Sequence, residues 1–257
     1  MFSNKVVLIT GASSGIGADT AEEFAKHEAK LVLTGRNEEN LLKVAERCTE
    51  VSPKSLRPLC IIADMNKETD IENIIKKTID HYKKLDILIN NAGIFESGSI
   101  ENTSLAQYDK IMNTNVRGLY YLTMLAVPFL LETKGNIVNL SSIAGLRSFP
   151  NILAYCISKA SLDQFTRCVA LELAPKGVRV NAVNPGLIKT NIHFRSGMNE
   201  QEYEVFVEKA KQVHPIGRVG EAREVTSAII FLASDGASNI TGATLPVDGG
   251  RHASCPR

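Results

Sequence analysis

A glycine-rich stretch near the start of the chain, residues 10–17 (TGASSGIG), constrains what this sequence can fold into more than any other feature. The branched apolar run before it, residues 5–9, predicts a buried parallel strand, and residues 18–26 after it have helical apolar spacing. Glycines allow a tight turn close to a ligand, and free N–H groups at a helix start attract an anion. An ordinary strand-to-helix turn could use the same residues. The order strand, glycine turn and helix nevertheless favours a nucleotide diphosphate site.

The composition of the chain predicts one sizeable domain and disfavours several kinds of partner. A length of 257 residues is enough for a single α/β domain spanning residues 1–257. The 29 basic and 28 acidic residues give a net charge of +1 without blocks of like charge, which disfavours nucleic-acid binding. No apolar run is long enough to span a bilayer, and residues 1–5 leave no room for a signal peptide. Five cysteines without a Cys-x-x-Cys pair indicate reduced thiols, so we expect a cytoplasmic protein.

Apolar runs and helical patterns alternate along the chain. Strands are predicted at residues 5–9, 30–34, 59–63, 85–89, 136–140, 178–183 and 244–247. Helices are predicted at residues 18–26, 38–49, 68–82, 104–131, 153–174, 200–212 and 221–234. This alternation is typical of an α/β fold of the Rossmann type, a doubly wound parallel sheet of about seven strands with helices on both faces.

Polar residues and glycines follow the predicted strands, at the sheet edge where such folds bind ligands. The residues at these strand ends are Gly11, Arg36, Asp64, Asn91, Ser142, Pro185 and Gly186. Folds that bind NAD place an acid after the second strand, about 20 residues beyond the glycines, to hold the ribose 2′-hydroxyl. Here the position holds Arg36, whose planar fork of donors suits a 2′-phosphate. A solvated arginine is the alternative, but the sequence favours NADP(H) and makes NAD(H) less likely.

A tyrosine and a lysine four residues apart, Tyr155 and Lys159, are candidates for the chemistry. Residues at this spacing share a helix face, and a nearby cation lowers the pKa of a tyrosine toward the neutral range. The pair alone is weak, because it occurs by chance on many solvated helices. Ser142 at a strand end could hydrogen-bond a substrate carbonyl. Asn115 lies inside a predicted helix, where asparagine is mildly unfavourable. Either its side-chain amide has a functional role, or the residue is simply exposed on the helix.

Taken together, these residues resemble the short-chain dehydrogenase/reductase superfamily in its compact one-domain form. The match covers nearly the whole chain. The residues that carry it are 10–17, Asp64, Asn90 to Gly93, Asn115, Ser142, Tyr155, Lys159, Asn184 to Gly186, and Thr190. The resemblance implies hydride transfer between a nicotinamide cofactor and a carbonyl or alcohol. A reduced cellular NADP pool would favour carbonyl reduction.

The resemblance also implies roles for individual residues. Tyr155 would donate and accept the proton, Lys159 would lower its pKa and bind the nicotinamide ribose, and Ser142 would position the carbonyl. Asn115 would hold a water that links Lys159 to solvent. The expected cofactor-binding residues are Gly11, Ser13, Ser14, Gly15, Ile16, Gly17, Arg36, Asn37, Asp64, Met65, Asn91, Ala92, Gly93, Tyr155, Lys159, Pro185, Gly186, Ile188 and Thr190.

Two features leave alternatives open at the level of the family. Many NADP-preferring members have a basic residue where this chain has Ser14, so the cofactor preference rests on Arg36. The family implies a homotetramer. An NAD-linked secondary-alcohol dehydrogenase is one alternative function, and a non-catalytic protein that senses nucleotide or acts as a scaffold is another. The complete catalytic set favours an active enzyme.

The regular alternation of strands and helices stops at residues 187–215, which we expect to form a substrate-binding flap. Its apolar residues are Tyr203, Val205, Phe206, Val207 and Val213, and Ile94, Phe95, Leu146 and Phe149 could add further walls. These side chains either line the site or pack the flap on the core. If they line the site, the substrate is an apolar ketone or secondary alcohol, such as a steroid, an isoprenoid or a 3-oxoacyl thioester. His193 and His214 are expected at the surface, and no cluster of metal ligands is visible.

Overall fold

The structure, a computed structural model, describes residues 1–190 and 199–254 and contains a parallel sheet with helices on both faces. The strands are β1 (Val6–Thr10), β2 (Lys30–Gly35), β3 (Leu59–Ile62), β4 (Ile87–Asn90), β5 (Asn136–Leu140), β6 (Arg179–Pro185) and β7 (Thr244–Val247). Their order in the sheet is β3-β2-β1-β4-β5-β6-β7. Every pairing is parallel, and the order reverses between β1 and β4. The predicted doubly wound sheet of Rossmann type is confirmed.

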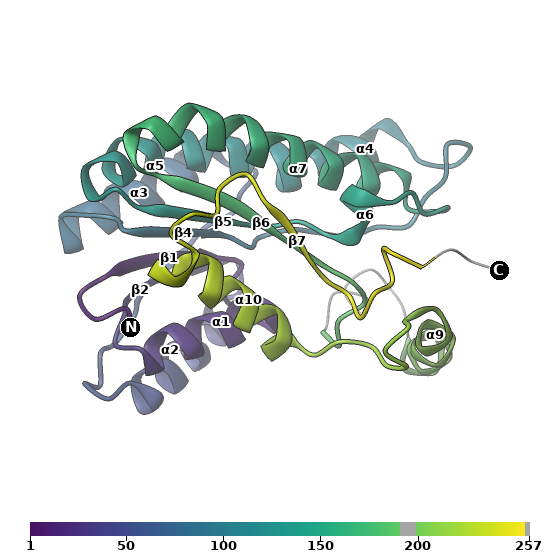
Figure 1. The fold of residues 1–257 in the computed structure, drawn as a ribbon, viewed down its shortest axis with the longest axis horizontal. Coiled ribbons are helices and arrows are strands. Elements are labelled where there is room, and N and C mark those ends of the chain that lie inside the picture. Colours follow the sequence, from purple (N-terminus) through teal and green to yellow (C-terminus); the bar gives the residue numbers. More distant parts are fainter. Residues whose placement is uncertain (191–198, 255–257) are drawn as a thin grey trace.

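The helices form two layers that enclose the sheet. They are α1 (Gly15–Lys26), α2 (Glu38–Val51), α3 (Glu68–Tyr82), α4 (Leu105–Met112), α5 (Leu119–Thr133), α6 (Ile143–Leu146), α7 (Leu153–Leu173), α9 (Glu200–Val213) and α10 (Ala222–Ala233). Figure 1 shows α1, α2 and α10 below the sheet, with α3, α5 and α7 above it. Helix α9 lies apart from both layers, beyond one end of the sheet (Figure 1).

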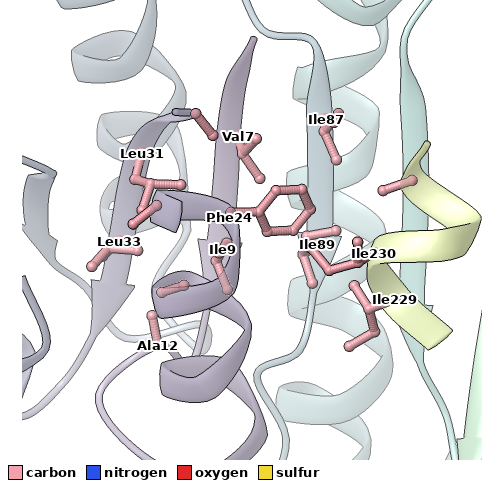
Figure 2. Packing of buried hydrophobic residues seen from close by; sticks show 14 of the residues in the cluster. Val7, Ile9, Ala12, Phe24, Leu31, Leu33, Ile87, Ile89, Ile229 and Ile230 are labelled. Atoms are coloured by element: carbon pink, nitrogen blue, oxygen red, sulfur yellow. The ribbon is translucent and has the colours of Figure 1, made fainter. Parts of the chain in front are cut away.

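Each layer of helices packs on the sheet through its own apolar core. Under α1 and α10, the ring of Phe24 is fully buried among residues of β1 and β4 such as Val7 and Ile89 (Figure 2). On the opposite face, α3 and α5 contribute Ile74 and Leu122 to the second core. Burying a side chain of this size stabilises the fold by roughly 1.5–3 kcal/mol relative to exposure. The sheet is thus packed on both faces, and these cores fix the position of its carboxyl edge.

Two elements differ from the sequence prediction. The helix predicted at residues 104–131 is interrupted by a π-helical segment, Asn113–Gly118, between α4 and α5. A side chain at Gly118 would place its Cβ within 2.2 Å of the Met65 carbonyl oxygen, so the segment passes close to the loop after β3. The short helix α6, which follows Ser142, was not predicted. Four residues are too few to give a readable helical period.

Candidate active site

Two cavities open at the carboxyl edge of the sheet, and they share part of their walls. The first, of about 390 Å³, is lined by Gly11, Ser13, Ser14, Gly15, Ile16, Thr34, Gly35, Arg36, Asn37, Asn40, Ala63, Asp64, Met65, Asn91, Ala92, Gly93, Ile94, Thr114, Leu140 and Thr190. The second, of about 470 Å³, is lined by apolar residues and by Ser142, Tyr155 and Lys159. The residues common to both are Ile16, Asn91, Gly93, Ile94, Leu140 and Thr190. A ligand in the first cavity therefore lies against a ligand in the second.

The glycine turn of the first cavity is tied to the end of β4 by Asn91. Its side-chain Nδ2 donates to the carbonyl oxygens of Thr10 and Gly11, at 2.7 and 3.1 Å. The Thr10 hydroxyl accepts from the backbone N–H groups of Asn91 and Ala92, at 3.0 and 2.9 Å. Gly11 has a φ of +63°, and a Cβ there would lie 2.9 Å from the Ala92 Cα. Position 11 therefore requires glycine, because the neighbouring strand end leaves no room for a side chain.

Gly17 plays a different part from the one expected of it. It is absent from the walls of both cavities, and its added Cβ would lie 2.4 Å from Asn91 Nδ2. It therefore permits close packing of α1 against the turn and is not a wall of the site. The other glycine at the helix start, Gly15, lines the first cavity with a φ of +56°.

The far end of the first cavity lies beside the ends of β2 and β3. Arg36 is exposed there, and Asn37 caps α2 by accepting from the Asn40 N–H at 2.8 Å. Burial alone would raise the pKa of Asp64, but hydrogen bonds from Asn66 and the charge of Arg36 lower it below its usual value. Asp64 is therefore ionised and held by its own loop, while Arg36 is the cation nearest this end among the described lining residues.

The second cavity brings together the candidate catalytic side chains. Tyr155 and Lys159 lie on consecutive turns of α7, and the Lys159 Nζ is 5.7 Å from the centroid of the Tyr155 ring. Ser142 begins α6 and accepts from the Ala144 N–H at 3.1 Å. Phe95 packs edge-on against the Tyr155 ring, with centroids 5.1 Å apart. The fold thus brings residues that are up to 60 positions apart in the sequence next to the phenol of Tyr155.

The pKa of Tyr155 is not lowered as the sequence analysis expects. Burial raises it to about 12, and hydrogen bonding with Ser142 offsets only part of that increase. The pKa of Lys159 falls to about 8, because burial disfavours its charge, while Asp163 opposes that decrease. At neutral pH the phenol is therefore protonated and the lysine is largely charged. Such a phenol is a proton donor.

Lys159 is held in place by the end of β5. Its Nζ donates to the Leu140 carbonyl oxygen at 2.7 Å, and its own carbonyl oxygen accepts from Ser141 at 3.3 Å. Of the two adjacent serines, Ser141 is therefore committed to the backbone of α7, whereas Ser142 interacts with the phenol. This favours Ser142 as the carbonyl-positioning residue.

Asn115 lies in the π-helical segment and is 1% exposed, so it is not a surface helix residue. Its Oδ1 accepts from the Ile94 N–H at 2.8 Å, and its Nδ2 donates to the Ile94 carbonyl and to Ser158 Oγ. A Cβ at Gly93 would lie 3.4 Å from Asn115 Oδ1 and 3.7 Å from Lys159 Nζ. The side chain thus fixes the loop after β4 beside Lys159, and both hydrogens of its amide are already used.

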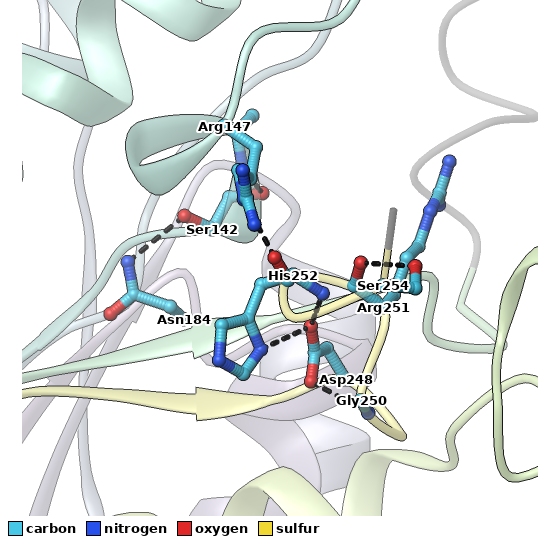
Figure 3. Close-up of polar contacts among 9 residues, drawn as sticks. Ser142, Arg147, Asn184, Asp248, Gly250, Arg251, His252 and Ser254 are labelled. Atoms are coloured by element: carbon cyan, nitrogen blue, oxygen red, sulfur yellow. Dashed lines mark hydrogen bonds and ion pairs between the residues drawn. The ribbon is translucent and has the colours of Figure 1, made fainter. Parts of the chain in front are cut away.

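A buried carboxylate that sequence reasoning missed, Asp163, lies one turn beyond Lys159 on α7. Asn184 donates through Nδ2 to both Asp163 oxygens at 3.0 Å. It also donates to the Ser142 carbonyl oxygen at 2.9 Å (Figure 3). A Cβ at Gly145 would lie 2.3 Å from Asp163 Oδ2, so the backbone of α6 packs directly against this carboxylate. An acid at the i+4 position after Lys159 was the only signal in the sequence.

The flap residues divide between the cavity and the surface. Phe206 and the predicted wall residues Ile94, Phe95 and Phe149 line the second cavity, and Leu146 does not. Val207 packs with Leu187, Ala210 and Val219, while Val205 and Val213 are about half exposed. Some flap side chains therefore line the cavity and others pack the flap on the core, so each of the two alternatives holds for part of the flap.

The histidine prediction needs one correction. His214 is buried, at 3% exposure, and its Nδ1 contacts the Ala210 carbonyl oxygen, so the surface prediction is wrong for this residue. His193 lies outside the described residues. Pro185, Gly186, Ile188 and Thr190, which the sequence analysis expects to bind cofactor, line the second cavity, and Thr190 also lines the first. Within residues 1–190 and 199–254, no three His, Cys, Asp or Glu side chains are grouped to hold a metal ion, and no helix could cross a membrane.

Comparison with known proteins agrees with this geometry. A family model described as enoyl-(acyl carrier protein) reductase matches residues 11–252. The chain is 36% identical to a meso-2,3-butanediol dehydrogenase of Serratia marcescens, over 98% of this chain and 96% of the relative. It is also 36% identical to an L-xylulose reductase of Caenorhabditis elegans, over 97% and 96% of the two chains. The crystal structure of levodione reductase superimposes with a TM-score of 0.94 at 32% identity, covering 99% of this chain and all of the other.

The chain belongs to the short-chain dehydrogenase/reductase superfamily, whose members are oxidoreductases acting on alcohols and carbonyls with NAD(P)(H). The first cavity fits such a cofactor. Gly15 and Ile16 at the start of α1 line this cavity, and the first turn of α1 carries N–H groups that have no acceptor within the helix and no acidic side chain. A diphosphate at that helix start satisfies both features.

Proposed function

We propose that this protein is an NADP(H)-dependent reductase that converts the carbonyl of an apolar ketone into a secondary alcohol. The observation that carries the proposal is the convergence of Ser142, Tyr155 and Lys159 in an apolar cavity that shares six wall residues with the cavity for the cofactor. Residues 1–257 act as one catalytic domain, and residues 187–215 contribute the substrate-binding flap.

The chain supplies positioning and proton transfer for this reaction. The cofactor, when bound, supplies the hydride. Ser142 donates a hydrogen bond to the carbonyl oxygen, and Tyr155 gives its phenolic proton to the same oxygen as negative charge develops there. Lys159, held by the Leu140 carbonyl, stabilises the charge that is left on the phenol oxygen. At neutral pH the phenol of Tyr155 is protonated, so it carries the proton that this step transfers.

The preference for NADP(H) is supported by Arg36 at the far end of the first cavity. Its guanidinium can form two parallel hydrogen bonds to a 2′-phosphate. Asp64 is already occupied by hydrogen bonds from Asn66, so a ribose hydroxyl would compete for it. Use of NAD(H) by an alcohol dehydrogenase is the alternative, which Ser14 favours because it adds no second cation.

The apolar substrate class is supported by the walls of the second cavity. Phe95, Phe149 and Phe206 line the cavity that also contains Ser142, Tyr155 and Lys159. Such walls favour a steroid, an isoprenoid or a 3-oxoacyl chain over a small hydrophilic sugar.

Assembly and location are proposed from the family and the surface. Helices α5 and α7 expose large apolar side chains, including Tyr120, Met124 and Leu171, which supports their burial in a homotetramer. The balanced charge supports an absence of nucleic-acid binding, and the sequence supports a cytoplasmic location without a membrane span.

The test is cofactor oxidation by the purified protein across apolar ketones, 3-oxosteroids and 3-oxoacyl thioesters, measured with NADPH and with NADH. We expect turnover of at least one ketone class, with NADPH much the better cofactor. Faster turnover with NADH, or oxidation of secondary alcohols alone, would instead identify an NAD-linked dehydrogenase. Tight NADPH binding without turnover of any carbonyl or alcohol would identify a sensor or scaffold.

A further inference from the structure

An arginine from the far end of the chain, Arg251, lies in the wall of the second cavity. It follows β7 on a turn and is half-buried. Its guanidinium lies over the ring of Phe149, with the Cζ 5.0 Å from the ring centroid. An arginine stacked on an aromatic ring has fewer conformations, so its donors are held in a fixed direction. The position was not among the residues that sequence patterns singled out.

The turn that carries Arg251 is itself well ordered by hydrogen bonds (Figure 3). The Asp248 carboxylate accepts from the N–H of Gly250 and from both the N–H and the ring Nδ1 of His252. Arg147, which follows α6, donates through Nε to the His252 carbonyl oxygen at 2.6 Å. The turn is thus fastened to the segment that carries Ser142, and Arg251 keeps a constant place relative to the reacting groups.

The charges around the second cavity are unbalanced. Its described wall contains two cations, Lys159 and Arg251, and no carboxylate. Lys159 donates to the Leu140 carbonyl oxygen, whereas the Arg251 guanidinium forms no hydrogen bond with any residue that the structure describes. Burial lowers the pKa of Arg251, and the charge of Asp248 opposes that decrease. The Asp248 oxygens are nevertheless taken up by Gly250 and His252.

The guanidinium of Arg251 is only partly buried, so its donors are accessible and can exchange water for the acceptors of a ligand. A carboxylate matches it best, because its two oxygens meet the arginine fork in parallel. The same cavity has many apolar lining residues, including Phe149 and Ile152. One cavity therefore combines reacting groups suited to a carbonyl, a cation suited to an anion, and apolar surface.

We propose that Arg251 binds the carboxylate of the substrate, so that the protein reduces an oxo acid whose apolar chain separates its carbonyl from its acid group. This inference rests on the proposed function, and it narrows the substrate class from apolar ketones to their anionic members. The acid group of the substrate determines specificity, while Ser142 and Tyr155 act on its carbonyl.

The first experiment compares unbranched oxo acids, from 4-oxopentanoate to 8-oxononanoate, with their methyl esters as substrates. For the chain length that spans the two sites, we expect kcat/KM for the acid to exceed that for the ester by about 10- to 100-fold. Arg251→Met should reduce this ratio toward one, chiefly through the KM of the acid, and Arg251→Lys should retain part of it. The exposed Arg57 offers a matched control, and Arg57→Met should leave the ratio unchanged.

The second experiment measures binding without turnover, so that it does not depend on the proposed reaction. Calorimetry with octanoate and octanamide, in the presence of NADPH, compares wild type with Arg251→Met and Arg251→Lys. Octanoate should bind about 10-fold or more tightly than octanamide, and only where the cation is present. If that preference is found while no oxo acid is reduced, the proposed function fails and the anion site stands. Equal binding of the two probes, or an acid preference that persists in Arg251→Met, would overturn the inference.

Discussion

The two cavities of the site differ in how they are built. The first takes most of its wall from residues 11–65, around the ends of β1, β2 and β3, with a second contribution from residues 91–94. The second takes its walls from at least six separate stretches of the chain, including those that carry Phe95, Phe149, Phe206 and Arg251. A site made of turns next to strands is encoded locally, whereas a site made of side chains from remote segments depends on the tertiary fold.

Replacement of Arg36 tests whether specificity in the first cavity resides in a single side chain. Because Arg36→Asp removes the cation and adds repulsion toward a 2′-phosphate, we expect the ratio of kcat/KM for NADPH to that for NADH to fall by about 10- to 100-fold. Arg36→Leu should produce a smaller decrease, since it removes the attraction only. Steady-state kinetics with both cofactors measures the ratio. An unchanged ratio in both variants would show that the backbone alone chooses the cofactor.

A neighbouring pair on α9 tests the division of the flap between cavity and surface. Phe206 lines the second cavity and Val205 is 54% exposed. Phe206→Ala should raise the KM of an apolar substrate about 3- to 10-fold through lost apolar contact, and Val205→Ala should not alter it. Phe206→Leu, which keeps an apolar side chain against the cluster of Leu187, Ala210 and Val219, should give an intermediate value. Equal effects of Val205→Ala and Phe206→Ala would remove α9 from the substrate site.

The pH dependence of reduction tests the coupling between Asp163 and Lys159. Lys159 has a lowered pKa of about 8, so its stabilising charge is present below that pH and is lost as the pH rises through it. The rate of carbonyl reduction should therefore decline above about pH 8. Asp163→Asn removes a charge that raises the pKa of Lys159, so the decline should move to lower pH with a small loss of rate at neutral pH.

The control for this measurement lies on the same helix. Glu172 is exposed on α7, and Glu172→Gln removes one carboxylate without disturbing the Asn184 network. Its pH profile should coincide with that of wild type. If the Asp163→Asn profile coincided with both, Asp163 would have only a structural role.

Most of the fold followed from the sequence because its signals are local. The strand at residues 136–140 and the helix at residues 68–82 have the predicted bounds. The break in the helix at residues 104–131 did not follow, because it lies where Gly118 approaches Met65, 53 residues away along the chain. Apolar periodicity cannot report such a contact.

The parts of the candidate site that lie in local sequence motifs were predictable, and the parts that depend on tertiary contacts were not. Gly11, Asn91, Tyr155 and Lys159 lie where the motifs placed them, since each is close to a strand end or a helix start. The raised pKa of Tyr155 was not predictable, because it comes from burial, which outweighs the Ser142 hydrogen bond. Arg251 and the Asp163 carboxylate came into view only with tertiary contacts.

The measurement that tests the central claim most directly is a comparison of wild type with Tyr155→Phe in both halves of the site. The claim is that the phenol acts on substrate in the second cavity and that the first binds cofactor by itself. Reduction of the best ketone should fall about 10²- to 10⁴-fold in kcat, while the Kd for NADPH, measured by fluorescence titration, should change little. Reduction that survived the loss of the hydroxyl would contradict the account, as would a loss of activity explained by lost NADPH binding.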